Sequence, residues 1–231
     1  MSEAKGMGIN MNNGYQDLSC SAYTTNNNHT REKYTEFAEH IKVHGLKVDS
    51  YFMDNNIFIK NFLNGIDEII INEQEKLIRI VRWDVGMKGE NFAPDPARTK
   101  AGRLNPEKVA YLYLGNNEIT AMKETRIKKR ESFYIGTFRS RTNLKILDFS
   151  SDREAERSKV NSYKLIIDEE FSKPLKDSDE KKEYLPTQFI AKLIKDKGYD
   201  GVKYSSALCE SGYNICIFEA NNMECVHFEY R

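Results

Sequence analysis

The sequence predicts a mixed α+β protein in which helices flank a β core, and three observations lead to this class. Apolar runs of strand length recur along the last two thirds of the chain, helical patterns separate them, and no internal repeat is present. The first 75 residues contain helical spacing and a single run that suits either helix or strand. We therefore expect an N-terminal arm and helical extension over residues 1–75 and the main domain over residues 76–231.

The composition limits the classes of function. The 231 residues suit one large domain, and 35 Lys and Arg residues balance 35 Asp and Glu residues. Balanced charge provides no overall field for nucleic acid or anionic lipid, so we expect no direct nucleic-acid partner and no membrane partner. The N-terminus carries no apolar run that predicts a signal peptide or membrane span, which favours a cytoplasmic location.

Potential metal ligands are few and scattered. His40 and His44 have the spacing of two helical ligands, but no motif supplies a third, so we read them as surface histidines. The cysteines contain no CxxC pair and are read as reduced thiols: Cys20, Cys209, Cys216 and Cys225. No metal site is expected.

Helical patterns dominate the N-terminal region. Residues 1–30 are rich in Asn, Ser, Thr and Gly, and we interpret them as a mobile or loosely packed arm. Apolar spacing predicts a helix over residues 31–44, ended by Gly45, and a second helix over residues 54–63. Residues 66–71 suit helix or strand.

The main domain alternates strand and helix signals. Apolar runs predict strands at residues 77–83, 109–114, 133–138, 144–149, 202–205, 214–219 and 224–230. Helical patterns cover residues 152–171 and a late segment that Thr187 would cap and Gly198 would end. Residues 86–99 form a long loop, a type of segment that often covers a site.

The stretch 101–130 is the centre of the functional argument. It reads as a turn at Gly102–Pro106, the strand 109–114, and a helix capped by Asn116 or Asn117. Ile119, Met122 and Ile127 recur at helical spacing and predict the buried stripe of that helix.

Three polar residues project from these adjacent elements. Arg103 lies in the turn, Tyr113 in the strand and Glu124 on the helix, roughly 140° around from Ile119 and therefore off the apolar stripe. Such an arrangement suits a site, and the sequence leaves open whether the three side chains converge.

These residues resemble the signature of the RES domain, the toxin of RES–Xre toxin–antitoxin pairs. The similarity is carried by the following segments: G-R-x-N-P at 102–106, x-Y-L at 112–114, A-x-x-E at 121–124, the arginine of 77–79, and the later segments 184–188 and 201–206. It covers about two thirds of the chain. The resemblance implies an ADP-ribosyltransferase-like fold and an enzyme that consumes NAD.

The resemblance also implies roles near the scissile bond. Glu124 matches the family glutamate, which would stabilise an oxocarbenium-like sugar, and Tyr113 would stack on nicotinamide or hydrogen-bond near it. Arg79 matches the first family arginine, with Arg82 as the alternative in a shifted register. Without the resemblance, the same residues suit an exposed glutamate paired with Lys128, a core tyrosine and an edge-strand arginine.

Two further positions complete the implied site. Arg103, with the first arginine, would hold the pyrophosphate or ribose by forked hydrogen bonds. The family serine has no clear counterpart. At the start of the late helix, Thr187 keeps a hydroxyl and a shifted Leu185 does not; on the following strand, Ser205 or Ser206 would serve.

The implied function is cleavage of the nicotinamide–ribose bond of NAD, with inorganic phosphate or water as acceptor. NAD is then the substrate, without a metal, and no GxGxxG or P-loop pattern suggests another mode of nucleotide binding. The alternatives are an ADP-ribosyltransferase acting on a protein target, and a non-enzymatic interaction module. The resemblance further implies an Xre-type helix-turn-helix antitoxin that blocks the site.

Overall fold

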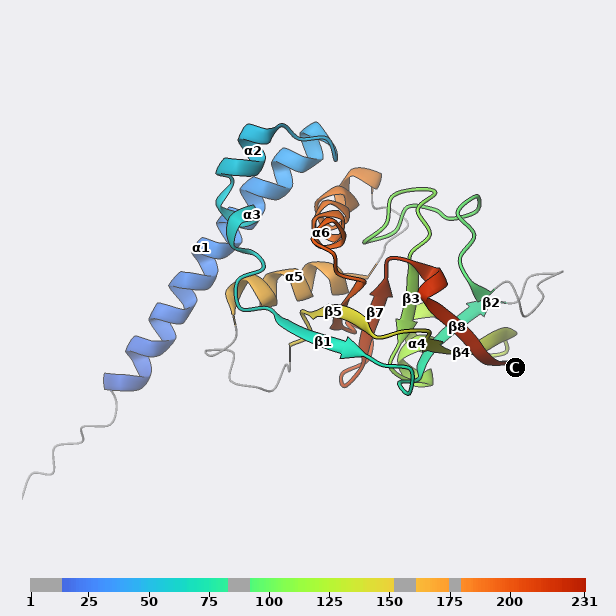
Figure 1. Cartoon of the computed structure of the whole chain (residues 1–231). Coiled ribbons are helices and arrows are strands. Elements are labelled where there is room, and N and C mark those ends of the chain that lie inside the picture. Colours follow the sequence, from blue (N-terminus) through green and yellow to red (C-terminus); the bar gives the residue numbers. More distant parts are fainter. Residues whose placement is uncertain (1–13, 83–91, 152–160, 175–179) are drawn as a thin grey trace, which may run out of the picture.

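An eight-stranded sheet forms the centre of the computed structural model, which describes residues 14–82, 92–151, 161–174 and 180–231, with side chains from residue 27 onward (Figure 1). The strands are β1 (Asp67–Ile71), β2 (Leu77–Arg82), β3 (Leu112–Gly115), β4 (Phe133–Ser140), β5 (Leu144–Asp148), β6 (Gly201–Ser205), β7 (Tyr213–Ile217) and β8 (Met223–Tyr230). Their spatial order is β1-β5-β6-β7-β3-β2-β4-β8.

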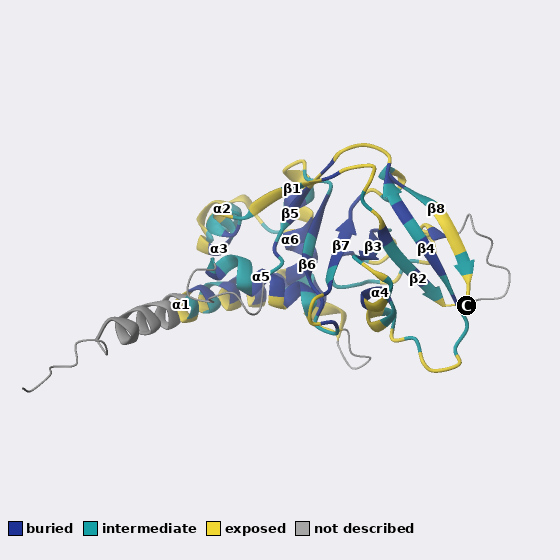
Figure 2. Ribbon diagram, turned by 90° about the horizontal axis from the view of Figure 1, so that it is seen from below, coloured by how far each residue is buried: buried dark blue, intermediate teal, exposed yellow. Residues whose placement is uncertain are grey.

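The strand pairing is mixed. β5 and β6 run parallel and the other neighbours run antiparallel. β2 and β3 share a single residue pair, Ile78 opposite Gly115, whereas β2 pairs with β4 along its full length. The sheet is therefore joined weakly at the β2–β3 boundary. Burial is deepest in its middle strands, and much of the edge strand β8 is exposed (Figure 2).

The helices divide into two groups. They are α1 (Gly14–His44), α2 (Ser50–Asn55), α3 (Ile57–Asn61), α4 (Glu118–Thr125), α5 (Ser162–Ser172) and α6 (Leu185–Asp196), with 3₁₀ turns at Lys181–Tyr184 and Ala220–Asn222. α5 and α6 pack on β6 and on α1, while α4 packs on β2 and β3 (Figure 1). The mixed α+β class predicted from the sequence is confirmed.

Two apolar cores follow the alternation of side chains along the strands. One face of the sheet, with Val202 and Phe218, packs against α1, α5 and α6 in a core that contains Phe37, Ile167 and Ile190. The opposite face contributes a second core from seven strands, with these buried members: Ile71, Leu77, Leu112, Leu114, Phe138, Leu144, Ile146, Ile215, Ile217 and Met223. The N-terminal helices thus share a core with the helices of the main domain.

Several element boundaries differ from the sequence prediction. α1 begins at Gly14, well before residue 31, and ends before Gly45, whose φ of 76° is the conformation that glycine adopts easily. The helix predicted over residues 54–63 is two short helices. Asn56 separates them because its backbone is extended, and its side chain accepts from the Ile59 N–H to cap α3. Residues 66–71 provide β1, which pairs with β5.

The predicted cap of α6 was wrong, and the predicted apolar stripe of α4 was wrong at Ile119 but not at Met122 and Ile127, which pack against the core around Ala121. α6 begins at Leu185 with Pro186 in its first turn, so Thr187 lies inside the helix and is not its cap. On α4, Ile119 is 62% exposed, whereas Thr120 and Ala121 are buried. α4 lies so close to β3 that a Cβ on Gly115 would be 3.0 Å from the backbone N of Ala121, and only small side chains fit at this contact.

Residues 86–91 of the predicted covering loop 86–99 and residues 152–160 of the predicted helix 152–171 lie outside the described residues. Within the described part of the chain, no helix has the length and apolar character needed to cross a bilayer.

Candidate active site

A cavity of about 450 Å³ lies at the weakly paired β2–β3 boundary, bordered by α4, the turn 102–106 and the end of α5. Its lining includes Arg79, Arg103, Tyr113 and Glu124. The four residues come from strand, turn, strand and helix, and the sequence left their convergence open. In the structure they border one space, of a size typical for small-molecule sites.

Glu124 is held at this cavity by two polar residues from distant parts of the chain. Its Oε1 accepts a hydrogen bond from the Ser206 hydroxyl at 2.5 Å and another from the Asn214 side-chain amide at 2.9 Å. Ser206 is itself fixed, because its Oγ accepts from the backbone N–H groups of Leu208 and Cys209. The carboxylate is therefore oriented, whereas a glutamate paired only with other surface groups would be mobile.

Arg79 is the arginine of β2 that reaches the cavity. Its Nη1 donates to the Tyr113 carbonyl at 3.3 Å, and burial lowers the pKa of Arg79 to about 10. Its Nε is buried and has no hydrogen-bond partner among the described residues. Arg82, the alternative in a shifted register, instead donates to the Thr125 and Arg126 carbonyls at the end of α4. Of the two arginines, Arg79 therefore lines the cavity and Arg82 does not.

Tyr113 presents its ring, and its hydroxyl is already engaged. The hydroxyl donates to Asn105 Oδ1 at 2.7 Å and accepts from the Leu104 N–H at 3.2 Å. Burial raises the pKa of Tyr113 well above its usual value, so the phenol stays protonated. Of the two functions expected for Tyr113, stacking fits this arrangement better than a hydrogen bond from the hydroxyl.

Arg103 lies at the rim of the cavity, and both its side chain and its backbone carbonyl form hydrogen bonds with other parts of the chain. Its Nη2 donates to the Lys173 carbonyl at 2.8 Å and the Pro174 carbonyl at 3.2 Å, and its guanidinium lies over the Tyr184 ring. The Nε is buried without a hydrogen-bond partner in the described ranges. Thr187 donates its hydroxyl to the Arg103 carbonyl. Thr187 is 1% exposed and does not line the cavity, so it supports the turn and does not reach a ligand.

Ser205 and Ser206 have different surroundings although they are adjacent. Ser205 is buried, and both its N–H and its hydroxyl donate to Asp168 at 2.7 Å. Ser151 donates to the same carboxylate from its hydroxyl at 2.6 Å and from its N–H at 3.2 Å. Ser205 therefore belongs to a buried network that joins α5 to the end of β6, and only Ser206 contacts Glu124.

Two residues of the site were missed from the sequence. Asn214 lies on β7 opposite Gly115 and reaches Glu124, and Tyr204 lines the cavity from β6. Burial raises the pKa of Tyr204, and the nearby thiol of Cys216 and carboxylate of Glu124 add to this effect. A polar residue inside the apolar run of β7 was the one available signal for Asn214.

Metal ligands do not gather in the described part of the chain. No group of three or more His, Cys, Asp or Glu side chains there has the geometry of a metal site. The His40 ring stacks on Phe52 at 3.6 Å between centroids and lies 4.3 Å from the His44 ring. The cavity itself presents an oriented carboxylate, two guanidinium groups and aromatic rings.

Fold and cavity together define a mixed α+β protein with a cleft suited to an anionic ligand, because Arg79 and Arg103 both line it and the Nε of each has no hydrogen-bond partner among the described residues. Residues 77–230 match the family model of the RES domain, so the chain belongs to the RES domain family. It is similar to a chain of the M. tuberculosis MbcT–MbcA toxin–antitoxin complex, with 13% identity, a TM-score of 0.45, and coverage of 70% of this chain and 86% of that chain. A search of curated proteins returned no match.

Proposed function

We propose that the protein is a toxin-type enzyme that cleaves the nicotinamide–ribose bond of NAD. Membership of the RES domain family supports this proposal, since the family is described as NAD-consuming. The observation that carries it is the fixed carboxylate of Glu124, held by Ser206 and Asn214 at a cavity that Arg79 and Arg103 also line.

The bond to be broken determines what the site must supply. The C1′–N bond electrons leave with the nicotinamide nitrogen, which changes from cationic to neutral, so no general acid is needed at the leaving group. Positive charge then develops on the ribose, as in glycoside hydrolysis. A preorganised carboxylate beside the sugar stabilises that charge. Glu124 is oriented for this function.

The acceptor completes the reaction. Water attacking C1′ gives ADP-ribose, and the proton passes from the water to Glu124 or to solvent. Inorganic phosphate attacking C1′ gives ADP-ribose 1″-phosphate and needs no proton removed from an already ionised oxygen. Both remain open within the proposal. Arg79 and Arg103 line the cavity and would bind the pyrophosphate through their guanidinium groups, and the Tyr113 ring would stack against nicotinamide.

An antitoxin is part of the proposal. Members of the RES family are described as toxins paired with Xre-type antitoxins, and we expect such a helix-turn-helix partner to occlude this cavity. The test is co-expression with the product of a neighbouring open reading frame. Co-purification together with loss of nicotinamide release would support the pairing, and release at the same rate from the complex would contradict it.

Nicotinamide release from NAD tests the enzymatic proposal directly. The purified protein is assayed with and without phosphate beside Glu124→Gln and the control Glu118→Gln, a glutamate on the same helix that pairs with Arg231. Release by wild type and Glu118→Gln, with loss in Glu124→Gln, is expected. A phosphate requirement would name the acceptor. Labelled protein in place of free product would favour a protein acceptor, and failure to bind NAD would favour the interaction module.

A further inference from the structure

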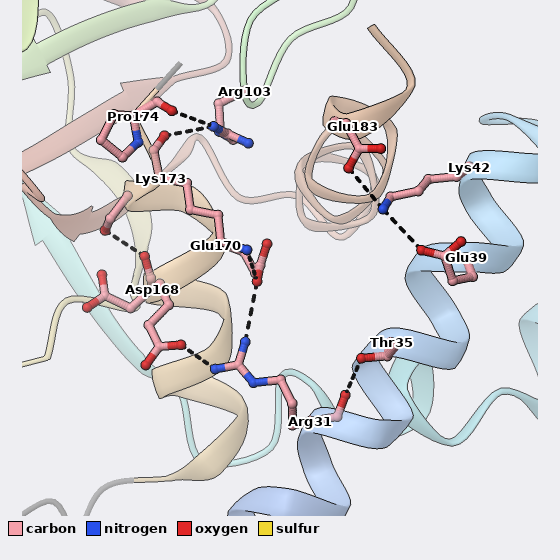
Figure 3. A network of polar contacts seen from close by, with 12 residues as sticks. Arg31, Thr35, Glu39, Lys42, Arg103, Asp168, Glu170, Lys173, Pro174 and Glu183 are labelled. Carbon is pink, nitrogen blue, oxygen red and sulfur yellow. Dashed lines mark hydrogen bonds and ion pairs between the residues drawn. The ribbon is translucent and has the colours of Figure 1, made fainter. Parts of the chain in front are cut away.

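A second hollow, of about 570 Å³, adjoins the active-site cavity on the side of the N-terminal helix (Figure 3). It lies between α1, the end of α5 and the start of α6. Arg103, Lys173 and Pro174 line both spaces, so the two hollows meet at the Arg103 guanidinium. The volume lies within the range of small-molecule sites.

The wall on the α1 side is built by ion pairs that fix the helix. Arg31 pairs with Glu170 at 3.3 Å, and Glu170 also accepts from Lys173. Figure 3 shows these groups around the hollow, with the Lys42 ammonium opposite them, 3.1 Å from Glu39. Since each of these charges has a partner, the hollow is preformed and does not present an unpaired cation at this wall.

The other lining residues suit a nucleoside. Tyr34 and Ala38 of α1 and Pro186 of α6 line the hollow with apolar edges of side chains that are otherwise buried, and the edge of a base can pack against them. Glu39 and Glu183, which share Lys42, present carboxylate oxygens. Carboxylates at nucleotide sites commonly accept hydrogen bonds from ribose hydroxyl groups.

The junction between the hollows suits a pyrophosphate. Arg103 has a buried Nε without a hydrogen-bond partner among the described residues, and the Lys173 ammonium lies on the same border. Arginine binds phosphate oxygens through two N–H groups at once. A dinucleotide consists of two nucleoside halves joined by a pyrophosphate, and the protein presents two hollows joined at cationic groups.

We propose that the second hollow binds the adenosine half of NAD, which places the pyrophosphate at Arg103 and Lys173 and the nicotinamide half beside Glu124. This inference rests on the proposed function, in which NAD is the substrate. α1 precedes residues 77–230, the segment that matches the RES family model. The adenosine site therefore draws one wall from outside the family segment, which gives the N-terminal helix a function in substrate binding.

The test fills the hollow from a position that the fold tolerates. Thr35 lines the hollow and is exposed, and its hydroxyl donates only to the Arg31 carbonyl of the same helix among the described contacts. Thr35→Trp would occupy the space. Glu36→Trp is the matched control, because Glu36 is also exposed on α1, pairs with Lys33 and lines neither hollow. Equal melting temperatures of the two variants would confirm equal folding.

ADP-ribose binding by calorimetry is the primary measurement, since it requires no catalysis. We expect Thr35→Trp to weaken binding by about tenfold or more through steric exclusion, with Glu36→Trp equal to wild type. The KM for NAD should rise in parallel, while nicotinamide release from nicotinamide mononucleotide, which lacks adenosine, should be the same in all three proteins.

The outcomes separate the two proposals. Unchanged ADP-ribose affinity in Thr35→Trp, or no binding by wild type, overturns the adenosine site. Weakened ADP-ribose binding in Thr35→Trp without any cleavage of NAD by wild type overturns the proposed function and leaves the site standing. An equal loss of mononucleotide cleavage in Thr35→Trp would show that the substitution acts on the whole cleft and would also overturn the assignment.

Discussion

Ser206 donates a 2.5 Å hydrogen bond to Oε1 of Glu124 across 82 positions of the sequence. The same hydroxyl oxygen accepts from two backbone N–H groups in the turn that follows β6. With these main-chain donors at its oxygen, the Ser206 hydroxyl donates its proton to the carboxylate. The serine therefore sets the orientation of the glutamate.

Removing this hydroxyl should slow the reaction more than it weakens substrate binding. In Ser206→Ala, Glu124 keeps the amide of Asn214 but loses its second anchor. We expect kcat for nicotinamide release to fall about ten- to a hundredfold, which is typical when a catalytic group is misplaced. KM should change by less than about threefold, because the arginines that would bind the substrate are unchanged. A wild-type kcat in Ser206→Ala would contradict the orienting role.

Replacing Arg79 by a neutral side chain of similar length should stabilise the fold and abolish substrate binding. Burial lowers the pKa of Arg79, so the folded protein carries an unfavourable charge at every pH below about 10. Arg79→Met removes this cost, and we expect a gain of about 1–2 kcal/mol in the free energy of unfolding. Thermal unfolding measures the gain, and a fall in melting temperature would show that Arg79 supports the fold.

The same pKa predicts a pH dependence of ligand binding. Arg79 loses its proton as the pH rises through about 10, far earlier than an exposed arginine. The affinity of wild type for ADP-ribose should therefore decline between pH 9 and 11, roughly one unit on each side of that pKa. Arg79→Lys serves as the comparison, and an affinity that is flat over this range would place Arg79 away from the anionic groups.

Thr187→Val tests whether the Thr187 hydroxyl supports the turn that carries Arg103. Valine keeps the shape but leaves the Arg103 and Tyr184 carbonyls without the hydroxyl that donates to them. Loss of a buried hydrogen bond of this kind costs about 1–2 kcal/mol. Chemical denaturation should show that loss. A rise in KM for NAD would follow if the turn shifts, whereas equal stability would contradict the assignment of Thr187 as a support.

Gly102→Ala tests the hydrogen bond between Asn105 of the same turn and the Tyr113 hydroxyl. A Cβ at Gly102 would lie 2.5 Å from Asn105 Oδ1, the atom that accepts from the Tyr113 hydroxyl. The Asn105 side chain must move, so the Tyr113 hydroxyl loses its acceptor and keeps only the contact with the Leu104 N–H. We expect destabilisation of about 1–3 kcal/mol, the cost of a buried polar group left unpaired. A variant as stable as wild type with an unchanged KM would show that the Asn105 contact is dispensable.

Strand positions were predictable because long apolar runs bury both faces of the middle strands. The middle strands β6 and β7 lie where the pattern placed them, and so do β2, β4 and the partly exposed edge strand β8. Of the residues predicted for the apolar stripe of α4, Met122 and Ile127 pack against the core around Ala121, and only Ile119 was wrong. The reason is local: α4 approaches Gly115 so closely that Ala121, and not Ile119, faces the sheet. Hydrophobicity alone does not report such close approach, which depends on the absence of a side chain on the neighbouring strand.

Some residues of the candidate site could be predicted from the sequence, and others required the structure. Signature residues placed Arg79, Arg103, Tyr113 and Glu124 at one cavity, because each lies on an element of fixed direction. The choice among hydroxyl groups required tertiary structure. Thr187, Ser205 and Ser206 all lie near the late helix or strand, and only the folding of the turn after β6 decides which hydroxyl meets Glu124.

The single residue pair between β2 and β3 has a mechanical consequence. Strands β1, β5, β6, β7 and β3 form one part of the sheet, and β2, β4 and β8 form the other. Helix α4 contacts both β2 and β3 and so bridges the boundary between the two parts. A ligand that contacts both Arg79 on β2 and Tyr113 on β3 would hold the two groups of strands together. The amide protons along this boundary should then exchange slowly with ligand bound and quickly without it, so the protein should be most rigid in its ligand-bound state.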